Sequence, residues 1–322
     1  MVPEPGAPEG GTGLGRVSDG GDRLDHVSGR VLDGEDSGGL GSGGLDSARE
    51  GGGLVRVRLD VAYDGTDFSG WAPQPGRRTV AGVLAGQLIR VLGPAEGLTV
   101  AGRTDAGVHA SGQVCHVDVA GAAWAAVRTT LIRRLAGLLP PDVRVLAATE
   151  VPASFDARFG ALARRYEYRV TDAPYGADPL WARYTLAWPR PLDLPSLSAA
   201  SVGLAGEHDF AAYCKRKEHA TTIRAVRRLD WRRESGRVLV ATVEADAFCQ
   251  AMVRSLIGAL LAVGDGRRPV PWPAGLLTRA ERASEVTVAP PHGLTLVAVD
   301  YPTDPAEYAA RAEVTRNRRT MS

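Results

Sequence analysis

Lysine, cysteine and long apolar runs are all scarce in this sequence of 322 residues. No apolar run reaches the roughly 18 residues that a membrane-spanning helix needs. The N-terminus lacks the basic stretch and following apolar stretch of a secretory signal. The cysteines Cys115, Cys214 and Cys249 lie far apart, with no Cys-x-x-Cys pair. Their spacing predicts a reducing compartment, no structural disulfide and no zinc knuckle. We therefore expect a cytoplasmic protein that does not enter a membrane.

Several common catalytic signatures are also missing. Neither lysine, Lys215 or Lys217, follows the glycines of a phosphate-binding loop. There is no His-Glu-x-x-His and no Gly-x-Ser-x-Gly motif, so zinc protease and serine hydrolase chemistry have no sequence support. His208, Cys214 and His219 are close in sequence, but a structural zinc site needs a fourth ligand. The sequence therefore predicts no metal site.

The charge of the sequence is unevenly distributed. The first 53 residues hold 17 of the 39 glycines and have ten acidic side chains against four basic ones. This segment has too little apolar surface to offset its chain entropy, so we expect a disordered leader over residues 1–53. The remaining residues carry 34 basic and 27 acidic side chains. That basic body suggests a nucleic-acid partner, although a GC-rich genome would also enrich arginine.

Hydrophobic periodicity predicts the element order β-α-β-β-α-β in a first domain, residues 54–152. This order is typical of a ferredoxin-like split unit. The expected strands cover residues 55–61, 98–101, 108–119 and 143–151, and the expected helices cover residues 79–92 and 124–139.

A second domain, residues 153–302, repeats this pattern with insertions. Its expected strands cover residues 165–170, 184–188, 223–232, 238–243 and 294–301, and its helices cover residues 194–204, 249–263 and 274–282. We expect an α+β fold in which two ferredoxin-like units form one mixed, mostly antiparallel sheet, with helices on one side and a central cleft. Residues 303–322 are expected to be a polar tail.

The most informative segment is the turn Gly-Arg-Thr-Asp-Ala-Gly at residues 102–107, between two expected strands. Its Asp105 carboxylate is ionised at pH 7 and needs no neighbouring base to act as a nucleophile. An aspartate bounded by glycines also forms Asx-turns, so a purely structural role is the alternative.

Two other features of the sequence are candidates for a role in binding or catalysis. Arg254 lies in the most apolar expected helix, where a guanidinium either reaches solvent along the edge of the core or pairs with an anion. Tyr166 and Tyr168 share one face of a strand flanked by arginines. Such a surface is able to stack a base and neutralise phosphates, but alternating tyrosines are also ordinary packing residues.

Together these motifs resemble the tRNA pseudouridine synthase A family. The resemblance covers about residues 54–302, and the Gly-Arg-Thr-Asp segment followed by Val-His-Ala is its most specific part. The motifs that carry it are residues 63–71, 102–110, 155–159, 164–168, 207–210, 252–254, 258, 263–266 and 291–294.

This resemblance implies isomerisation of uridine to pseudouridine at nucleotides 38, 39 and 40 of the tRNA anticodon stem-loop. It implies that Asp105 is the nucleophile, that Tyr166 packs against the base and assists deprotonation at C5, and that Arg254 pairs with the nucleophile. It links Arg103 to base flipping, and leaves open whether C6 of the base or C1′ of the ribose is attacked.

The resemblance also implies how the protein assembles and what it binds. It implies a homodimer in which one tRNA contacts both subunits, with no metal or organic cofactor. We expect Tyr63, Arg103, His109 and Arg165 to contact the RNA. The competing hypotheses are a non-catalytic RNA-binding protein, in which Asp105 is structural, and an unrelated metabolic α+β enzyme. A binding protein has no need of this carboxylate, guanidinium and phenol together, so the isomerase is favoured.

Overall fold

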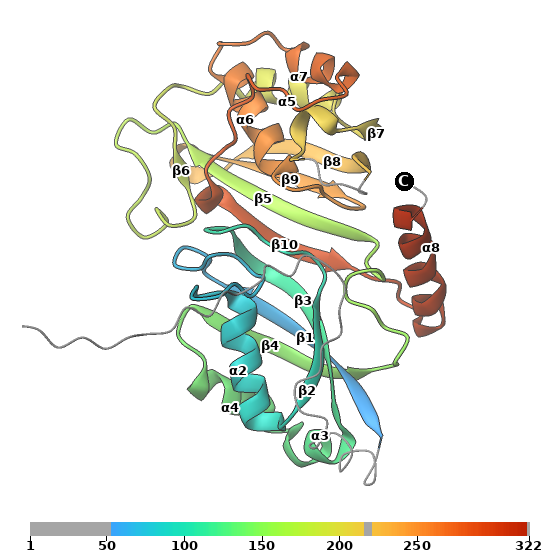
Figure 1. Ribbon diagram of the computed structural model, residues 1–322. Coiled ribbons are helices and arrows are strands. Elements are labelled where there is room, and N and C mark those ends of the chain that lie inside the picture. The colour runs from blue at the N-terminus through green and yellow to red at the C-terminus, as the bar shows by residue number, and fades with distance from the viewer. Residues whose placement is uncertain (1–52, 216–220, 321–322) are drawn as a thin grey trace, which may run out of the picture. The chain divides into compact units, whose positions relative to one another are not determined.

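A mixed sheet of ten strands runs through the part of the chain that the computed structural model describes, residues 53–215 and 221–320 (Figure 1). The strand order is β4-β1-β3-β10-β5-β9-β8-β7, with β2 added beside β3 and β6 beside β5. Only the pairs β3–β10 and β5–β6 are parallel among the described strands. The expected α+β class with a mostly antiparallel sheet is therefore confirmed. The expected leader lies outside the described residues, apart from Gly53.

The first half has the expected order of elements. The bounds are β1 Leu54–Tyr63, α2 Val80–Leu92, β2 Ala95–Val100, β3 His109–Ala120, α3 Gly121–Val127, α4 Leu131–Leu138 and β4 Val143–Val151. The prediction of one helix over residues 124–139 is wrong, because two helices, α3 and α4, share this segment. The break falls at the β-branched pair Thr129 and Thr130, where the Thr130 hydroxyl donates to the Val127 carbonyl and competes with helical bonding.

The second half has strands and helices close to those expected, with additions. The bounds are β5 Ala163–Thr171, β6 Leu186–Ala187, α5 Leu194–Val202, β7 Gly206–Asp209, β8 Ile223–Arg233, β9 Val238–Ala245, α6 Met252–Gly264, α7 Trp272–Gly275, β10 Leu294–Asp300 and α8 Tyr308–Thr320. The helix expected over residues 274–282 is wrong, because α7 is followed only by a 3₁₀ turn, Leu276–Thr278. The charged residues after this turn provide no apolar stripe to bury.

Helices α2 and α6 show how the sequence positions the two halves of the site. Thr79 caps α2 by accepting a hydrogen bond from the Gly82 amide through its side chain, as its sequence position predicts. Helix α6 is apolar on almost every side, and nearly all of its residues are buried. Both helices lie in front of the sheet in the view of Figure 1. Packing in the core fixes the position of α6, and therefore of Arg254, its charged residue.

The two halves of the sheet join through the parallel pair β3–β10. His109 lies opposite Thr295, and on the other edge of β10, Leu296 lies opposite Tyr166 of β5. The turn that holds Asp105 leads directly into β3. This register therefore brings that turn close to Tyr166, although the two are distant in sequence.

The cysteines correct another expectation. Cys214 and Cys249 form a disulfide, with their Cα atoms 5.6 Å apart, so the prediction of no structural disulfide is wrong. The segment after a 3₁₀ turn, Ala211–Tyr213, meets the segment before α6, and the sequence separation of 35 residues gave no sign of this contact. Within residues 53–215 and 221–320, no helix has the length and apolar character needed to cross a membrane.

Candidate active site

The turn between β2 and β3 is held in place by the segment that follows β1. The Trp71 amide donates to the Thr104 carbonyl at 3.1 Å, and the Gly107 amide donates to the Phe68 carbonyl at 3.4 Å. Gly70 has a φ of 92°, and a Cβ at this position would lie 2.8 Å from the Thr104 carbonyl oxygen. The aromatic loop at residues 63–71 therefore serves as a rigid support for the Asp105 turn.

Buried side-chain hydrogen bonds hold the same turn from below. The hydroxyls of Tyr63 and Thr104 are 2.8 Å apart, and Gln113 donates from Nε2 both to the Tyr63 hydroxyl at 3.2 Å and to the Gly102 carbonyl at 2.8 Å. Tyr63 is 5% exposed and Gln113 is fully buried. This network fixes the backbone on both sides of Arg103.

Asp105 faces Arg254 across the junction of the two halves. The distance from the Arg254 Nη1 to the Asp105 Oδ2 is 3.4 Å, and the two side chains are 19% and 37% exposed. Arg254 is itself oriented by a hydrogen bond from its Nε to the Ala289 carbonyl at 2.7 Å. A partly exposed carboxylate thus lies beside a guanidinium that the backbone holds in position.

Tyr166 provides an aromatic wall next to this pair. Its ring packs edge-on against Phe248, with centroids 5.3 Å apart, and a Cβ on Gly102 would lie 3.9 Å from its hydroxyl. Burial raises the pKa of Tyr166 to about 12; nearby Arg164 acts in the opposite direction, and the Asp105 carboxylate raises it. The phenol therefore stays protonated at neutral pH.

Asp105, Arg254 and Tyr166 line one cleft of about 1280 Å³. This volume exceeds that of a typical small-molecule pocket, about 300–1,000 Å³. Cationic side chains outnumber acidic ones in its lining. The basic residues are Arg103, Arg158, Arg164, Lys215, Arg224, Arg254 and Arg311, and the acidic residues are Asp105, Glu207 and Asp246. An anionic polymer suits such a lining.

Comparison with known proteins identifies the family. A family profile described as tRNA pseudouridine synthase matches residues 200–302. A tRNA pseudouridine synthase A of Frankia casuarinae is 61% identical over 258 residues, which cover 80% of this chain and 93% of that protein. Proteins of the same name from Mycobacterium leprae and Streptomyces griseus are 54% and 57% identical, over 81% of this chain and 94% and 93% of their own lengths. The chain belongs to the tRNA pseudouridine synthase A family.

A solved structure described as an H/ACA ribonucleoprotein bound to a substrate RNA containing 2′-deoxyuridine aligns only weakly. Its TM-score is 0.28 and its sequence identity 14%, over 64% of this chain and 44% of that chain. Family membership rests on the sequence relatives alone.

In this member of the family, four of the seven predicted site residues lie together. Asp105, Tyr166, Arg254 and Arg103 all line the cleft. Arg103 is exposed and makes no hydrogen bond or ion pair with any other described residue. Its guanidinium is therefore available to a ligand.

His109, by contrast, is buried behind the turn. It is 2% exposed, its Nδ1 accepts a hydrogen bond from the Gly65 amide at 2.9 Å, and its Nε2 lies 3.1 Å from the His292 carbonyl oxygen. The same Nδ1 also lies 3.1 Å from the Asp64 Oδ1. Burial lowers the pKa of His109, although the Asp64 carboxylate acts in the opposite direction.

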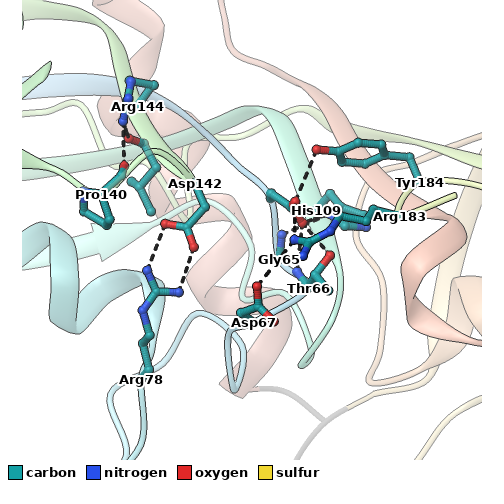
Figure 2. A network of polar contacts seen from close by, with 12 residues as sticks. Gly65, Thr66, Asp67, Arg78, His109, Pro140, Asp142, Arg144, Arg183 and Tyr184 are labelled. Carbon is teal, nitrogen blue, oxygen red and sulfur yellow. Dashed lines mark hydrogen bonds and ion pairs between the residues drawn. The ribbon is translucent and has the colours of Figure 1, made fainter. Parts of the chain in front are cut away.

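The surroundings of His109 connect three segments of the chain (Figure 2). The Asp64 carboxylate accepts hydrogen bonds from the amide and the hydroxyl of Thr66. It also accepts hydrogen bonds of 3.3 Å from the Arg183 guanidinium and the Tyr184 hydroxyl. The Tyr184 ring packs at 4.8 Å from the imidazole of His109. His109 thus ties the loop after β1 and the long loop after β5 to the first residue of β3, without entering the cleft.

Tyr63 and Arg165 also lie outside the cleft lining. Arg165 precedes Tyr166 on β5, so its side chain points to the opposite face of the sheet. There its Nε donates to Glu244 at 2.8 Å, and its Nη2 lies 3.6 Å from Asp300. These contacts place Arg165 in a surface ion-pair cluster.

Arg158 and Arg164 line the cleft although the sequence did not mark them as site residues, and both lie in motifs of the family resemblance. Arg164 is 7% exposed and donates to three backbone carbonyls, those of Ala101, Arg158 and Asp246, at 2.7–2.9 Å. Arg158 follows Asp156, whose carboxylate accepts from the amides of residues 158 and 159. The Phe-Asp-Ala-Arg-Phe motif was the available signal for Arg158.

A metal centre has no obvious donor set here. Among the described residues, no group of three or more His, Cys, Asp or Glu side chains is arranged to hold a metal ion. Of the three potential ligands grouped by sequence, Cys214 is in the disulfide, His208 is bonded to the Ala205 carbonyl, and His219 lies outside the described residues.

Proposed function

We propose that this protein isomerises uridine to pseudouridine at nucleotides 38, 39 and 40 of the tRNA anticodon stem-loop, with Asp105 as the nucleophile. One observation carries the proposal. The partly exposed Asp105 carboxylate lies 3.4 Å from the Arg254 guanidinium, beside the Tyr166 ring, in a large cationic cleft. Family membership supplies the reaction, and this geometry supplies the groups that the reaction requires.

The proposed reaction needs no co-reactant, because substrate and product are isomers. An Asp105 oxygen forms a bond to C6 of the uracil or to C1′ of the ribose, and the N1–C1′ bond breaks. The base then turns, C5 bonds to C1′, the C5 proton is lost to a base and N1 gains one, and Asp105 leaves. Arg254, whose Nη1 lies 3.4 Å from the Asp105 Oδ2, orients the carboxylate for the first and last of these steps.

Reaching the target base requires it to leave the helical stack, which costs a few kcal/mol. Stacking on an aromatic side chain returns about 1–3 kcal/mol per base. Tyr166 provides the aromatic surface in this proposal. Because its pKa is about 12, only about one phenol in 100,000 is ionised at pH 7. Tyr166 therefore acts mainly as a packing group and hydrogen-bond donor, and any role in removing the C5 proton requires bound substrate to lower its pKa.

The cationic lining supports binding of the RNA backbone. Neutralised phosphates supply most of the sequence-independent affinity for nucleic acid, so binding should fall steeply as salt rises. Arg103 is exposed, unpaired within the described chain and two residues from Asp105. This position suits a side chain that fills the space of the extruded base.

The proposal also includes a homodimer, a cytoplasmic location and no metal or organic cofactor. These three points rest on the family resemblance. The disulfide between Cys214 and Cys249 removes the argument from cysteine spacing for a reducing compartment. The chemistry itself calls for the carboxylate, its guanidinium partner, an aromatic wall and a base that takes the C5 proton.

The deciding experiment maps pseudouridine in unmodified tRNA after incubation with the protein. Asp105→Asn should form no pseudouridine at nucleotides 38–40 and still bind tRNA. Glu96→Gln is the matched control, since Glu96 is an exposed carboxylate outside the cleft lining. If Asp105→Asn forms product at the wild-type rate, Asp105 is not the nucleophile. If the wild-type protein binds tRNA but forms no product, the chain is a binding protein instead.

A further inference from the structure

Helix α8, Tyr308–Thr320, lies beyond the residues matched by the family profile and the family motifs. In Figure 1 it stands at the side of the sheet, apart from α5 and α6. The proposed chemistry assigns this helix no role, and the sequence indicated only a polar tail. Its contacts nevertheless show a defined position on the rest of the chain.

Several interactions fix α8 against the segment that leads to the cleft. The Arg316 Nη2 donates to the Asp156 carboxylate at 2.7 Å, and its guanidinium lies 5.0 Å from the centre of the Phe159 ring. The Tyr308 ring packs edge-on against Phe155 at 5.3 Å. Ala312, on the same helix, is 3% exposed. The helix is thus docked on the turn that carries Arg158.

One face of α8 belongs to the cleft itself. Arg311 and Thr315 both line it, and their spacing of four residues places them on the same side of the helix. The Arg311 Nη2 also donates to the Ala161 carbonyl at 3.1 Å, and this hydrogen bond orients the guanidinium. This face therefore forms part of the cleft wall.

Arg311 gives this wall a positive charge. Among residues 308–317, Arg311 is the charged residue that lines the cleft, since Glu313 and Arg316 are not part of its lining. Arg164 and Arg311 both line the cleft. Burial lowers the pKa of Arg164, and the nearby Arg311 guanidinium lowers it as well. Like charges held close together are stabilised by a bridging anion.

We propose that the Arg311–Thr315 face of α8 is an accessory RNA-binding wall that contacts backbone phosphates of the substrate tRNA. This proposal rests on the proposed function, since it extends the same cleft. The occupant is an RNA strand, because the cleft is large, includes the Asp105 site and has more basic than acidic residues in its lining. Arg316 acts through the position of α8, as a positioning residue.

The test compares tRNA affinity across a range of salt concentrations. Arg311→Gln should bind tRNA about 2- to 5-fold more weakly at ~0.1 M salt, as expected for loss of one partly exposed ion pair. The slope of log K against log salt should also fall by about one. Arg311→Lys keeps the charge and should retain the wild-type slope.

Arg90→Gln is the matched control, because Arg90 is an exposed arginine on α2 that does not line the cleft. It removes the same charge and should leave the slope unchanged. The proposal is overturned if Arg311→Gln has the same salt slope as Arg90→Gln. It is also overturned if Arg311→Lys loses as much tRNA affinity as Arg311→Gln, which would indicate a packing role for Arg311. Pseudouridine formation by the wild-type protein is measured in parallel, so failure of the wall and failure of the proposed function are distinguishable.

Discussion

Gly258 offers a sharp test of how the fold orients Arg254. It lies on α6 one turn after Arg254, where residues 287–289 cross the helix closely. A Cβ at Gly258 would lie 1.7 Å from the Thr287 carbonyl oxygen, and real contacts of this kind are essentially never shorter than 3.0 Å. Gly258→Ala therefore requires a backbone displacement of at least about 1.3 Å.

That displacement acts directly on the guanidinium. The Ala289 amide donates to the Arg254 carbonyl at 3.0 Å, and the Ala289 carbonyl accepts from the Arg254 Nε at 2.7 Å. Moving this segment changes the orientation of the group that faces Asp105. A misplacement of about 1 Å at a catalytic group costs about 100-fold in rate. Overpacking should also lower the free energy of unfolding by about 1–3 kcal/mol.

The assay measures kcat/KM for release of the C5 hydrogen from uridine in tRNA, together with thermal unfolding. Gly258→Ala should lose at least about 100-fold in kcat/KM at temperatures where it is folded. Gly86→Ala is the control, because a Cβ there meets nothing within 4 Å in the exposed middle of α2. It should gain about 0.5–1 kcal/mol of stability at unchanged kcat/KM. Wild-type kcat/KM in a folded Gly258→Ala protein would refute the argument.

Two further predictions concern the buried support of the site. Burial lowers the pKa values of His109, His116 and His292, so the unfolded chain takes up protons below about pH 6.5 that the folded chain resists. The free energy of unfolding should therefore fall as the pH is lowered from 7.5 to 5.5, and the urea midpoint of unfolding should fall with it. A urea midpoint at pH 5.5 equal to or higher than that at pH 7.5 contradicts this prediction. Tyr63→Phe removes the hydroxyl bonded to Thr104 and should cost about 1 kcal/mol in the free energy of unfolding, without changing the salt dependence of tRNA binding. A lower salt slope would instead indicate a direct RNA contact.

Local structure was accessible from the sequence where one physical signal dominated. Strand β1, Leu54–Tyr63, contains the predicted residues 55–61, because alternation of apolar and polar side chains marks a strand with one buried face. Thr79 marks the start of α2 by the hydrogen bond that its side chain accepts. The single helix predicted over residues 124–139 was wrong, because hydrophobic periodicity continues through Thr129 and Thr130. The helix breaks there because of hydrogen bonding to the backbone, which periodicity does not reveal.

The candidate site divides in the same way. The Asp105 turn, Tyr166 and Arg254 were predicted, and the structure places all three in one cleft. For Arg165, strand alternation already indicated the face opposite Tyr166, and its partner Glu244 lies 79 residues away. Aromatic and imidazole side chains in a motif look alike whether they touch a ligand or support the backbone. Burial of Tyr63 and His109 became evident only with the neighbours that surround them.

The sequence by itself determined the periodic strands and helices and the basic character of the body, because each depends on residues close together in the chain. The tertiary structure alone decided the pairing of β3 with β10, the disulfide of Cys214 with Cys249 and the docking of α8 through Arg316 and Asp156. These contacts join segments separated by 35 to 186 residues. Their free energy comes from packing and charge pairing between surfaces that no local pattern describes.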